Sequence, residues 1–349
     1  MKTIITLFVL LLYSTIINAQ IITVDNNLNS AAQYTDLQEA IDDANSGDTL
    51  YISGSGTTYG TVVLLINKPL VLIGAGINSE NPAEKQTSIN NIQFTEDGAS
   101  GCVFQNLIFS GGINYHDTID ISNIVVRRCK LNSINIASNS YNWLIENNII
   151  LGRINRVGGP PYPSDIIIRN NIFYNGSISI SNFKFGSIYI YNNLFLGQAG
   201  GPLVNLIDVT IKNNIFYYSI QVSGGSLGTT KEHSLIRNNL SFGTNFLFGG
   251  PGDDGSNQIT DPLFIDGDEN FSFLNDYRLQ DGSPALTASS SGEEIGIFGG
   301  VAPFPLDLAT EFFSNPNISI PLITEMEILS SDVPLDGSFE VQLKAHGSN

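Results

Sequence analysis

The sequence has few basic residues. Lysine and arginine together number 15, against 33 aspartates and glutamates, which gives a formal net charge of −18 at neutral pH. This imbalance argues strongly against nucleic acid and anionic membrane surfaces as partners, because their phosphates would be repelled. It also disfavours a polyanionic sugar, unless a local basic patch or a bridging cation offsets the repulsion.

Histidine and cysteine are scarce as well. The chain has three histidines and two cysteines, Cys102 and Cys129, and it has no Cys-x-x-Cys pair. We therefore expect no zinc or other metal held by these side chains. The two cysteines fall in different columns of the repeat described below, which favours two buried free thiols over a disulfide.

Long apolar runs are missing after the first residues. Met1-Lys2-Thr3 precedes a mostly apolar run from Ile4 to Ile17, and Asn18-Ala19-Gln20 follows it. This order is typical of a secretory signal peptide, so we expect residues 1–19 to be cleaved off after Ala19. The run is shorter than a bilayer span, which predicts no membrane insertion. The sequence thus predicts a secreted or extracytoplasmic protein.

What the chain has in quantity is an internal repeat. The motif apolar-x-Asn-Asn-apolar-apolar occurs at residues 145–150, 168–173, 190–195 and 211–216, with a weaker copy at 236–240 and degenerate copies at 104–109 and 126–131. Successive copies lie about 22 residues apart. A repeat this short, with alternating β-branched residues and no helical period, is typical of one coil of a solenoid of short strands.

Equivalent residues of successive coils should form columns along the solenoid axis, because parallel strands stack at a constant spacing. We expect the last apolar position of each motif to face the core, in a column made of Phe109, Leu131, Ile150, Phe173, Phe195 and Phe216. One Asn of each pair can adopt the left-handed backbone conformation at a coil corner, and its amide can bond the neighbouring coil. The Asn pairs are therefore interpreted as a structural ladder.

A helix is predicted at the start of the solenoid, where it would cover the open end of the core. Thr35-Asp36-Leu37-Gln38 has the spacing of a capping box, and apolar residues recur at helical spacing from Leu37 to Ala44. Gly47 is placed to end this helix. Strands are expected at 49–52, 62–66 and 70–73.

Segments at both ends resemble pectate-lyase-like β-helices. Leu37-Gln-Glu-Ala-Ile-Asp-Asp-Ala44, Gly47-Asp-Thr-Leu-Tyr-Ile52 and Leu70-Val-Leu-Ile-Gly-Ala-Gly76 look like their opening, and residues 261–264, 277–279, 282–285 and 295–300 look like their closing segment. The resemblance covers about residues 33 to 300. It implies an all-β fold, a secreted right-handed parallel β-helix with coils of about 22 residues and a short N-terminal capping helix. We expect this domain to span residues 20–300, followed by a small C-terminal β appendage at 301–349.

Proteins of that superfamily include polysaccharide lyases and hydrolases as well as binding and structural proteins, so the fold leaves the activity open. One polar column stands at strand entries and consists of Asn123, Asn142, Asp165, Ser187, Asp208 and His233. Asp165 and Asp208 would lie two coils apart, about 9.6 Å, near the upper limit for an inverting carboxylate pair. Asp165, Asp208 and His233 are the catalytic candidates. The alternative is a structural corner, because short polar residues are ordinary in turns.

A second column precedes the Asn pairs and should point outward. After Gln105 it contains Arg127, Glu146, Arg169, Tyr191, Lys212 and Arg237, which are the candidate ligand-binding residues. Its charges could form an exposed ionic ladder, or they could bind sugar hydroxyls and carboxylates. Tyrosines near this column would strengthen a carbohydrate surface, although tyrosine is also common in strands for packing alone.

No cofactor is expected. The acidic loops Asp253-Asp254-Gly255 and Asp266-Gly-Asp-Glu269 offer oxygen ligands for calcium, but neither matches a known calcium motif. Two hypotheses follow. The first is a non-catalytic, monomeric scaffold that binds a polysaccharide or another cell-envelope component. The second is a polysaccharide lyase or glycoside hydrolase acting on the outer face, with its acids supplied by different coils and loops.

Overall fold

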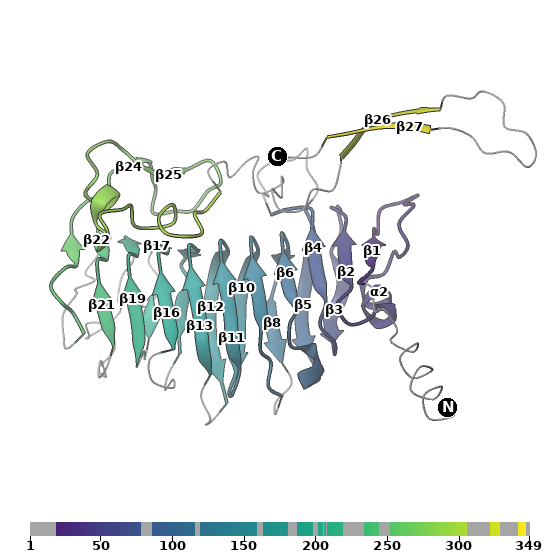
Figure 1. Cartoon of the computed structure of the whole chain (residues 1–349), viewed down its shortest axis with the longest axis horizontal. Helices are drawn as coiled ribbons and strands as arrows, with labels where there is room; N and C mark the ends of the chain where they lie inside the picture. Colours follow the sequence, from purple (N-terminus) through teal and green to yellow (C-terminus); the bar gives the residue numbers. More distant parts are fainter. Residues whose placement is uncertain are drawn as a thin grey trace, which may run out of the picture.

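The computed structural model describes residues 19–77, 86–115, 119–158, 163–180, 187–197, 202–204, 206, 208–218, 234–243, 252–305, 322–328 and 341–346. The predicted signal peptide lies almost wholly outside these residues. Two stacks of parallel strands run along the long axis of the molecule, as Figure 1 shows. The chain is therefore a parallel β-helix, and the predicted fold class is confirmed.

The first sheet has ten parallel strands. In spatial order they are β1 (Ile21–Val24), β2 (Thr49–Ile52), β4 (Val71–Gly74), β6 (Val103–Gln105), β9 (Ile124–Arg127), β11 (Tyr141–Glu146), β13 (Ser164–Arg169), β16 (Ile188–Tyr191), β19 (Val209–Lys212) and β21 (Leu235–Arg237). Neighbours in this order belong to successive coils, so each coil contributes one strand.

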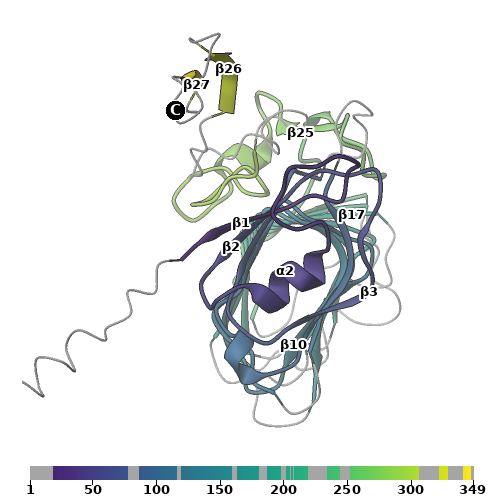
Figure 2. The same cartoon turned by 90° about the vertical axis from the view of Figure 1, so that its right-hand side faces the viewer.

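The second sheet has thirteen strands and lies opposite the first (Figure 2). They are β3 (Tyr59–Ile66), β5 (Ser88–Phe94), β7 (Ile108–Phe109), β8 (Gly112–Tyr115), β10 (Lys130–Ala137), β12 (Ile149–Val157), β14 (Ile172–Tyr174), β15 (Ser177–Ser179), β17 (Leu194–Leu196), β18 (Leu203–Val204), β20 (Ile215–Tyr217), β22 (Leu240–Phe242) and β23 (Gln258–Ile259). Two antiparallel pairs follow, β24 (Phe264–Asp266) with β25 (Asp276–Leu279) and β26 (Leu322–Ile328) with β27 (Val341–His346).

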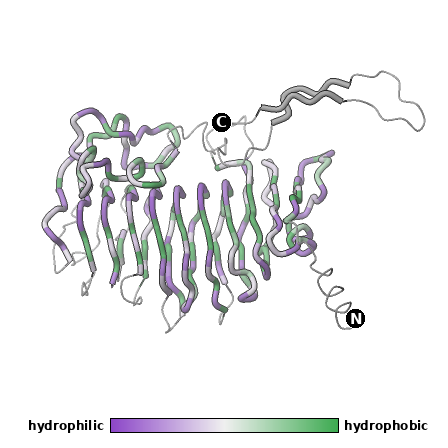
Figure 3. Tube along the Cα trace, in the orientation of Figure 1, coloured by the Kyte–Doolittle hydropathy of each residue, from purple (hydrophilic) through white to green (hydrophobic). Residues whose placement is uncertain are grey.

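The core lies between the two sheets, and hydrophobic and polar residues alternate along the strands that enclose it (Figure 3). The predicted inward column is confirmed, since each of its six residues is at most 2% exposed. The rings of Phe173 and Phe195 stack at 4.7 Å, and those of Phe195 and Phe216 stack at 4.8 Å. These separations match the strand spacing, so the aromatic stack follows the coil repeat.

The two asparagines of each pair have different roles. The first adopts the left-handed conformation at the corner between the sheets, with φ from 52° to 60° at Asn106, Asn147, Asn170, Asn192, Asn213 and Asn238. The second is buried and bonds the next coil: the backbone N–H of Asn171 donates to Oδ1 of Asn193 at 3.0 Å, and that of Asn193 to Oδ1 of Asn214 at 2.9 Å. The predicted ladder is confirmed, and the corner and the ladder use different asparagines.

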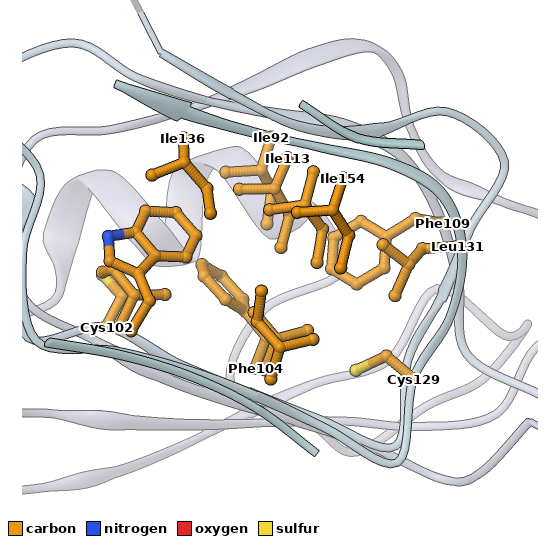
Figure 4. Packing of buried hydrophobic residues seen from close by; sticks show 14 of the residues in the cluster. Ile92, Cys102, Phe104, Phe109, Ile113, Cys129, Leu131, Ile136 and Ile154 are labelled. Atoms are coloured by element: carbon orange, nitrogen blue, oxygen red, sulfur yellow. The ribbon is translucent and has the colours of Figure 1, made fainter. Parts of the chain in front are cut away.

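The cysteines are free and buried, as predicted. They lie at separate corners of the core in Figure 4. Burial raises the pKa of each thiol to about 12. Cys129 takes the ladder position of its coil, and its backbone N–H donates to Oδ1 of Asn148 at 2.9 Å.

The predicted capping helix is α2 (Leu37–Asp43), which lies across the open end of the coils in Figure 2. Its N-cap is Asp36, whose side chain accepts from the N–H groups of Gln38 and Glu39. The expected capping box starting at Thr35 was wrong, because the carboxylate one residue later takes that role. The helix also ends at Asp43, before Gly47.

Gln38 of α2 protects the sheet edge beside it. Its Oε1 accepts from the backbone N–H of Leu65 at 2.8 Å, and its Nε2 donates to the carbonyl of Leu65 at 3.1 Å. Leu65 belongs to β3, which is the terminal strand of the second sheet. The amide therefore satisfies part of an edge that could otherwise pair with another chain.

At the other end the chain folds back over the solenoid. We call residues 261–304 the closing segment. The apolar residue that directly follows each Asn pair points out of the coil and is buried beneath this segment, in a second apolar cluster. Its solenoid members include Ile149, Ile172, Leu194, Ile215 and Leu240, and its closing-segment members include Phe264, Phe273, Tyr277, Ile295, Ile297 and Phe304.

The corner asparagines bind the closing segment. Asn238 donates to the carbonyl of Ala288, Asn170 to those of Ile297 and Gly299, and Asn147 to that of Ala302, all at 2.8 to 3.0 Å. The segment thus runs back along the corner, from the last coils toward the middle of the solenoid.

Candidate functional site

The outward column of the first sheet has the predicted register. Gln105 pairs with Arg127, Arg127 with Glu146, and Glu146 with Arg169. The column continues through Tyr191, Lys212 and Arg237. All seven residues come from the last position of their strands, directly before the coil corner. Together they form a polar strip along the edge of the first sheet.

A polar pocket of about 270 Å³ opens at the first four residues of this strip. Its lining is contributed by four adjacent coils and by the end of the closing segment. The lining residues are Gln105, Arg127, Arg128, Glu146, Asn147, Arg169, Val301, Ala302 and Pro303. Because Asn147 binds the carbonyl of Ala302, the same corner that turns the chain also holds one wall of the pocket in place.

Hydrogen bonds orient two of the arginines. Nε of Arg127 donates to Oε1 of Gln105 at 2.8 Å. Arg169 donates to Oε2 of Glu146 from Nε at 3.0 Å and from Nη2 at 2.7 Å. Glu146 is 8% exposed, so its charge is largely removed from water and is compensated by this ion pair.

Arg128 departs from the repeat. It has a φ of 52° at the corner position where six neighbouring coils have asparagine. Asparagine tolerates this conformation because its short side chain bonds locally, whereas a long side chain gains no such compensation. The coil that has this exception contributes two arginines, Arg127 and Arg128, to the pocket. Sequence reasoning treated this copy as merely degenerate and missed Arg128, although the Asn-to-Arg change within the motif was a usable signal.

The other three predicted ligand residues do not line this pocket. Nζ of Lys212 lies 4.5 Å from the centre of the Tyr191 ring, in a cation–π contact. Burial raises the pKa of Tyr191 to about 12. Nε of Arg237 lies 3.4 Å from Oδ2 of Asp254, which places one of the acidic loops against the far end of the strip.

The catalytic candidates lie at the opposite ends of the strands. Asp165 and Asp208 stand at the entries of β13 and β19, and their register with Ser187 keeps them two coils apart as expected. Both have left-handed backbones, with φ of 56° and 58°, as do Asn123 and Asn142 in the same column. A left-handed backbone at this position is typical of a corner where the chain turns. His233 lies outside the described residues.

The acidic loops form no metal site in the described part of the chain, where no group of three or more potential ligands comes together. Oδ1 of Asp253 accepts from Gly255 and from Asn257, and Oδ1 of Asp268 accepts from Asn270. These carboxylates thus complete their own turns. Of the helices the structure describes, none has the length and apolar character to cross a bilayer.

The fold and this site define a parallel β-solenoid with a mixed-charge pocket at the corner of its coils. No protein-family model matches the chain, and no curated protein matches it either. The class is therefore established by the stacked strands themselves.

Proposed function

We propose that this protein is a non-catalytic scaffold that binds an extracytoplasmic polysaccharide along the outer strip of its first sheet. The observation that supports the proposal most directly is the pocket, where Arg127, Glu146 and Arg169 meet the closing segment. Guanidinium and amide groups in fixed positions suit sugar hydroxyls and carboxylates. The resemblance of both ends of the chain to pectate-lyase-like proteins also favours a carbohydrate ligand.

The shape of the strip fits a polymer better than a small molecule. Its seven residues come from consecutive coils, so they repeat at the strand spacing of about 4.8 Å over seven of the ten strands of the first sheet. A polymer lying along the axis would meet several of these side chains at once. Many weak contacts then add up to useful affinity.

The small number of carboxylates at the pocket favours binding without catalysis. Glu146 is the one carboxylate among the described residues that line the pocket, and it is paired with Arg169. Glycoside hydrolysis normally needs two carboxyl groups on either side of the scissile bond. Asp165 and Asp208 stand at the other ends of the strands, so they cannot supply the second one here.

The test is a screen of the chain from Gln20 to Asn349 for binding and turnover on a glycan array and on soluble polysaccharides, with and without calcium. We expect binding without new reducing ends or unsaturated products. Release of products that is abolished by Asp165→Ala or Asp208→Ala would replace this proposal with the enzymatic hypothesis. No binding to any glycan would overturn it in favour of a protein-binding role.

A further inference from the structure

A carboxylate stands in the inward column of the first sheet. The strand register places Asp48 at the position where the following coils have apolar core residues. Those residues are Leu70, Cys102, Ile124, Trp143, Ile166, Ile188 and Val209, and each is at most 2% exposed. Asp48 is itself 0% exposed. A carboxylate that is removed from water is costly unless it is hydrogen-bonded and its charge is compensated.

Two backbone N–H groups bind this carboxylate. Oδ2 of Asp48 accepts from the N–H of Asn45 at 2.7 Å, which closes the turn between α2 and β2. Oδ1 accepts from the N–H of Gln20 at 2.7 Å, and Gln20 lies 28 positions away in the sequence. In the described part of the chain, no lysine, arginine or histidine forms an ion pair with Asp48. The carboxylate is therefore hydrogen-bonded, but its charge is not compensated.

Gln20 is held in place directly before β1. Its N–H donates to Asp48, and its carbonyl accepts from the N–H of Thr49 at 2.8 Å. Strand β1 is the terminal strand of the first sheet (Figure 1), so the pairing of β1 with β2 starts at Gln20. Ala19 and Gln20 are both exposed. The nitrogen of Gln20 thus belongs to a peptide bond between two exposed residues, and it points to a buried carboxylate.

We infer that Asp48 is the binding site for the α-ammonium group of a processed chain that begins at Gln20. The order of residues 1–20 predicts hydrolysis of the bond between Ala19 and Gln20 by a signal peptidase. Water adds its hydroxyl group to the carbonyl carbon of Ala19 and its hydrogen to the nitrogen of Gln20. At neutral pH the new carboxyl group of Ala19 releases a proton and the new amine takes one up. The N–H group that binds Asp48 becomes an ammonium group at the same position.

The ammonium group supplies the positive charge that the buried carboxylate lacks. A hydrogen bond between two ionised groups is roughly twice as strong as one between neutral groups. Salt screens such a pair little when one partner is buried. The unprocessed chain has one neutral N–H group at this point, so it cannot form the ion pair. Removal of residues 1–19 therefore strengthens the attachment of β1 to β2 and stabilises the first coil.

The alternative is that Asp48 acts only through its hydrogen bonds. It would then close the turn at Asn45 and hold the backbone of Gln20, and a neutral N–H group would be sufficient at both positions. In that case, removing the charge of the α-amine would leave the stability of the protein unchanged. A test must therefore remove the charge and keep the N–H group.

Acetylation of the α-amine of Gln20 makes this change, because it leaves one N–H group and no charge. The chain from Gln20 to Asn349 is prepared with a free and with an acetylated α-amine, in the native sequence, in Asp48→Asn and in Asp281→Asn. Asp281 is exposed and its side chain has no hydrogen bond within the described residues, so Asp281→Asn is the matched control for the loss of one carboxylate. Thermal unfolding of the six proteins is followed by circular dichroism.

We expect acetylation to lower the unfolding midpoint of the native sequence and of Asp281→Asn by at least about 3 °C, and that of Asp48→Asn by less than about 1 °C. An equal shift in the native sequence and in Asp48→Asn, or no shift in either, would overturn the inference. If Asp48→Asn does not fold, the acetylated and free forms of the native sequence still decide the question together with the reaction described next.

Cyclisation of the N-terminal glutamine gives an independent measurement. In this reaction the α-nitrogen of Gln20 attacks the carbonyl carbon of its own side chain, a lactam forms and ammonia leaves. Only the unprotonated amine can attack, so the ion pair with Asp48 should make the reaction at least tenfold slower in the folded chain than in the denatured chain. Mass spectrometry measures the loss of ammonia, and equal rates in the two states would contradict the ion pair. Both results are independent of the polysaccharide proposal, since neither Gln20 nor Asp48 lines the pocket.

Discussion

At the scale of single residues, periodic side chains stabilise the fold because each one meets its own equivalent in the next coil. Phe195 stacks between Phe173 and Phe216, and the buried amide of Asn193 lies between those of Asn171 and Asn214. Losing one member of such a column removes contacts on both sides. The inward phenylalanines and the second asparagines are therefore the least replaceable residues of the coil.

Phe195→Ala should destabilise the protein by about 3–5 kcal/mol, because it leaves a cavity between two stacked rings that cannot collapse without moving whole strands. Urea unfolding followed by circular dichroism measures this. Leu274→Ala is the control, since Leu274 is 82% exposed and its truncation should change stability by less than about 0.5 kcal/mol. A similar small change for Phe195→Ala would contradict the observed stack.

The two buried thiols should make the free energy of unfolding depend on pH. Burial raises the pKa of Cys102 and Cys129 to about 12, from an ordinary value of 9.0. The folded state therefore holds its thiol protons more tightly than the unfolded state. Their contribution to stability is complete below pH 9 and is lost as the pH rises through about 12.

A thiol reagent tests this directly. At pH 8 we expect no reaction of the native protein over hours and reaction of two thiols per chain after unfolding in denaturant, since the thiolate is the reactive form. Rapid labelling of the native chain would show that the core opens on that time scale. Stability measured between pH 8 and pH 11 should fall less in a variant with both cysteines replaced by alanine.

At the scale of elements, the corner between the two sheets does two things at once. Its first asparagines turn the chain, and their side chains donate to the carbonyls of the closing segment. The segment in turn covers the outward apolar residues of the second sheet. The closing segment is therefore held by residues that belong to the repeat itself.

Asn170→Asp should loosen this docking while keeping the corner. Aspartate also tolerates the left-handed conformation, as Asp165 and Asp208 show, but it cannot donate to Ile297 and Gly299. We expect a loss of about 2–4 kcal/mol of protection in the closing segment, because two buried carbonyls lose their donor and face a carboxylate.

Hydrogen exchange of the amides of Ile295 and Phe304 reports this loss, since both donate within the closing segment. Asn123→Asp is the matched control. Asn123 has a φ of 59°, is exposed, and its Oδ1 accepts from Asn142, a bond that aspartate can keep. If both variants exchange at the native rate, the asparagine bonds do not hold the segment.

At the scale of the whole molecule, the solenoid has two ends that must be closed. Helix α2 closes the first by burying Leu37, Ala40 and Ile41 in the core, and by satisfying the edge at Leu65 through Gln38. An uncovered coil would expose apolar core beside unpaired strand edges. The unpaired strand edge at such an end can form hydrogen bonds with a strand of another chain.

Ile41→Asn should undock α2 and convert the protein into a species that associates through its uncovered end. Sedimentation velocity and light scattering measure this as concentration-dependent growth. Glu39→Gln, on the exposed side of the same helix, is the control and should stay at the native size. The native chain is predicted to be a monomer, and a variant that stays at that size would mean that α2 does not protect the end.

The sequence alone determined the features that recur with the coil. The period of about 22 residues, the inward column, the asparagine ladder and the outward register of the strip were predictable, because translation along the axis places equivalent residues on top of each other. The strand at 49–52 and the capping helix were also predictable from local signals, although the N-cap was misplaced by one residue.

Only the tertiary structure decided what happens outside the coils. The pocket is lined by residues between 105 and 169 and by residues 301–303. The outward apolar residues of the second sheet, such as Ile149 and Ile215, are buried by the closing segment. The repeat pattern does not predict those contacts, because the closing segment has no repeat of its own. Its position depends on how its side chains pack against the coils. The strip could therefore be predicted from the sequence, whereas the pocket at its first four residues could not.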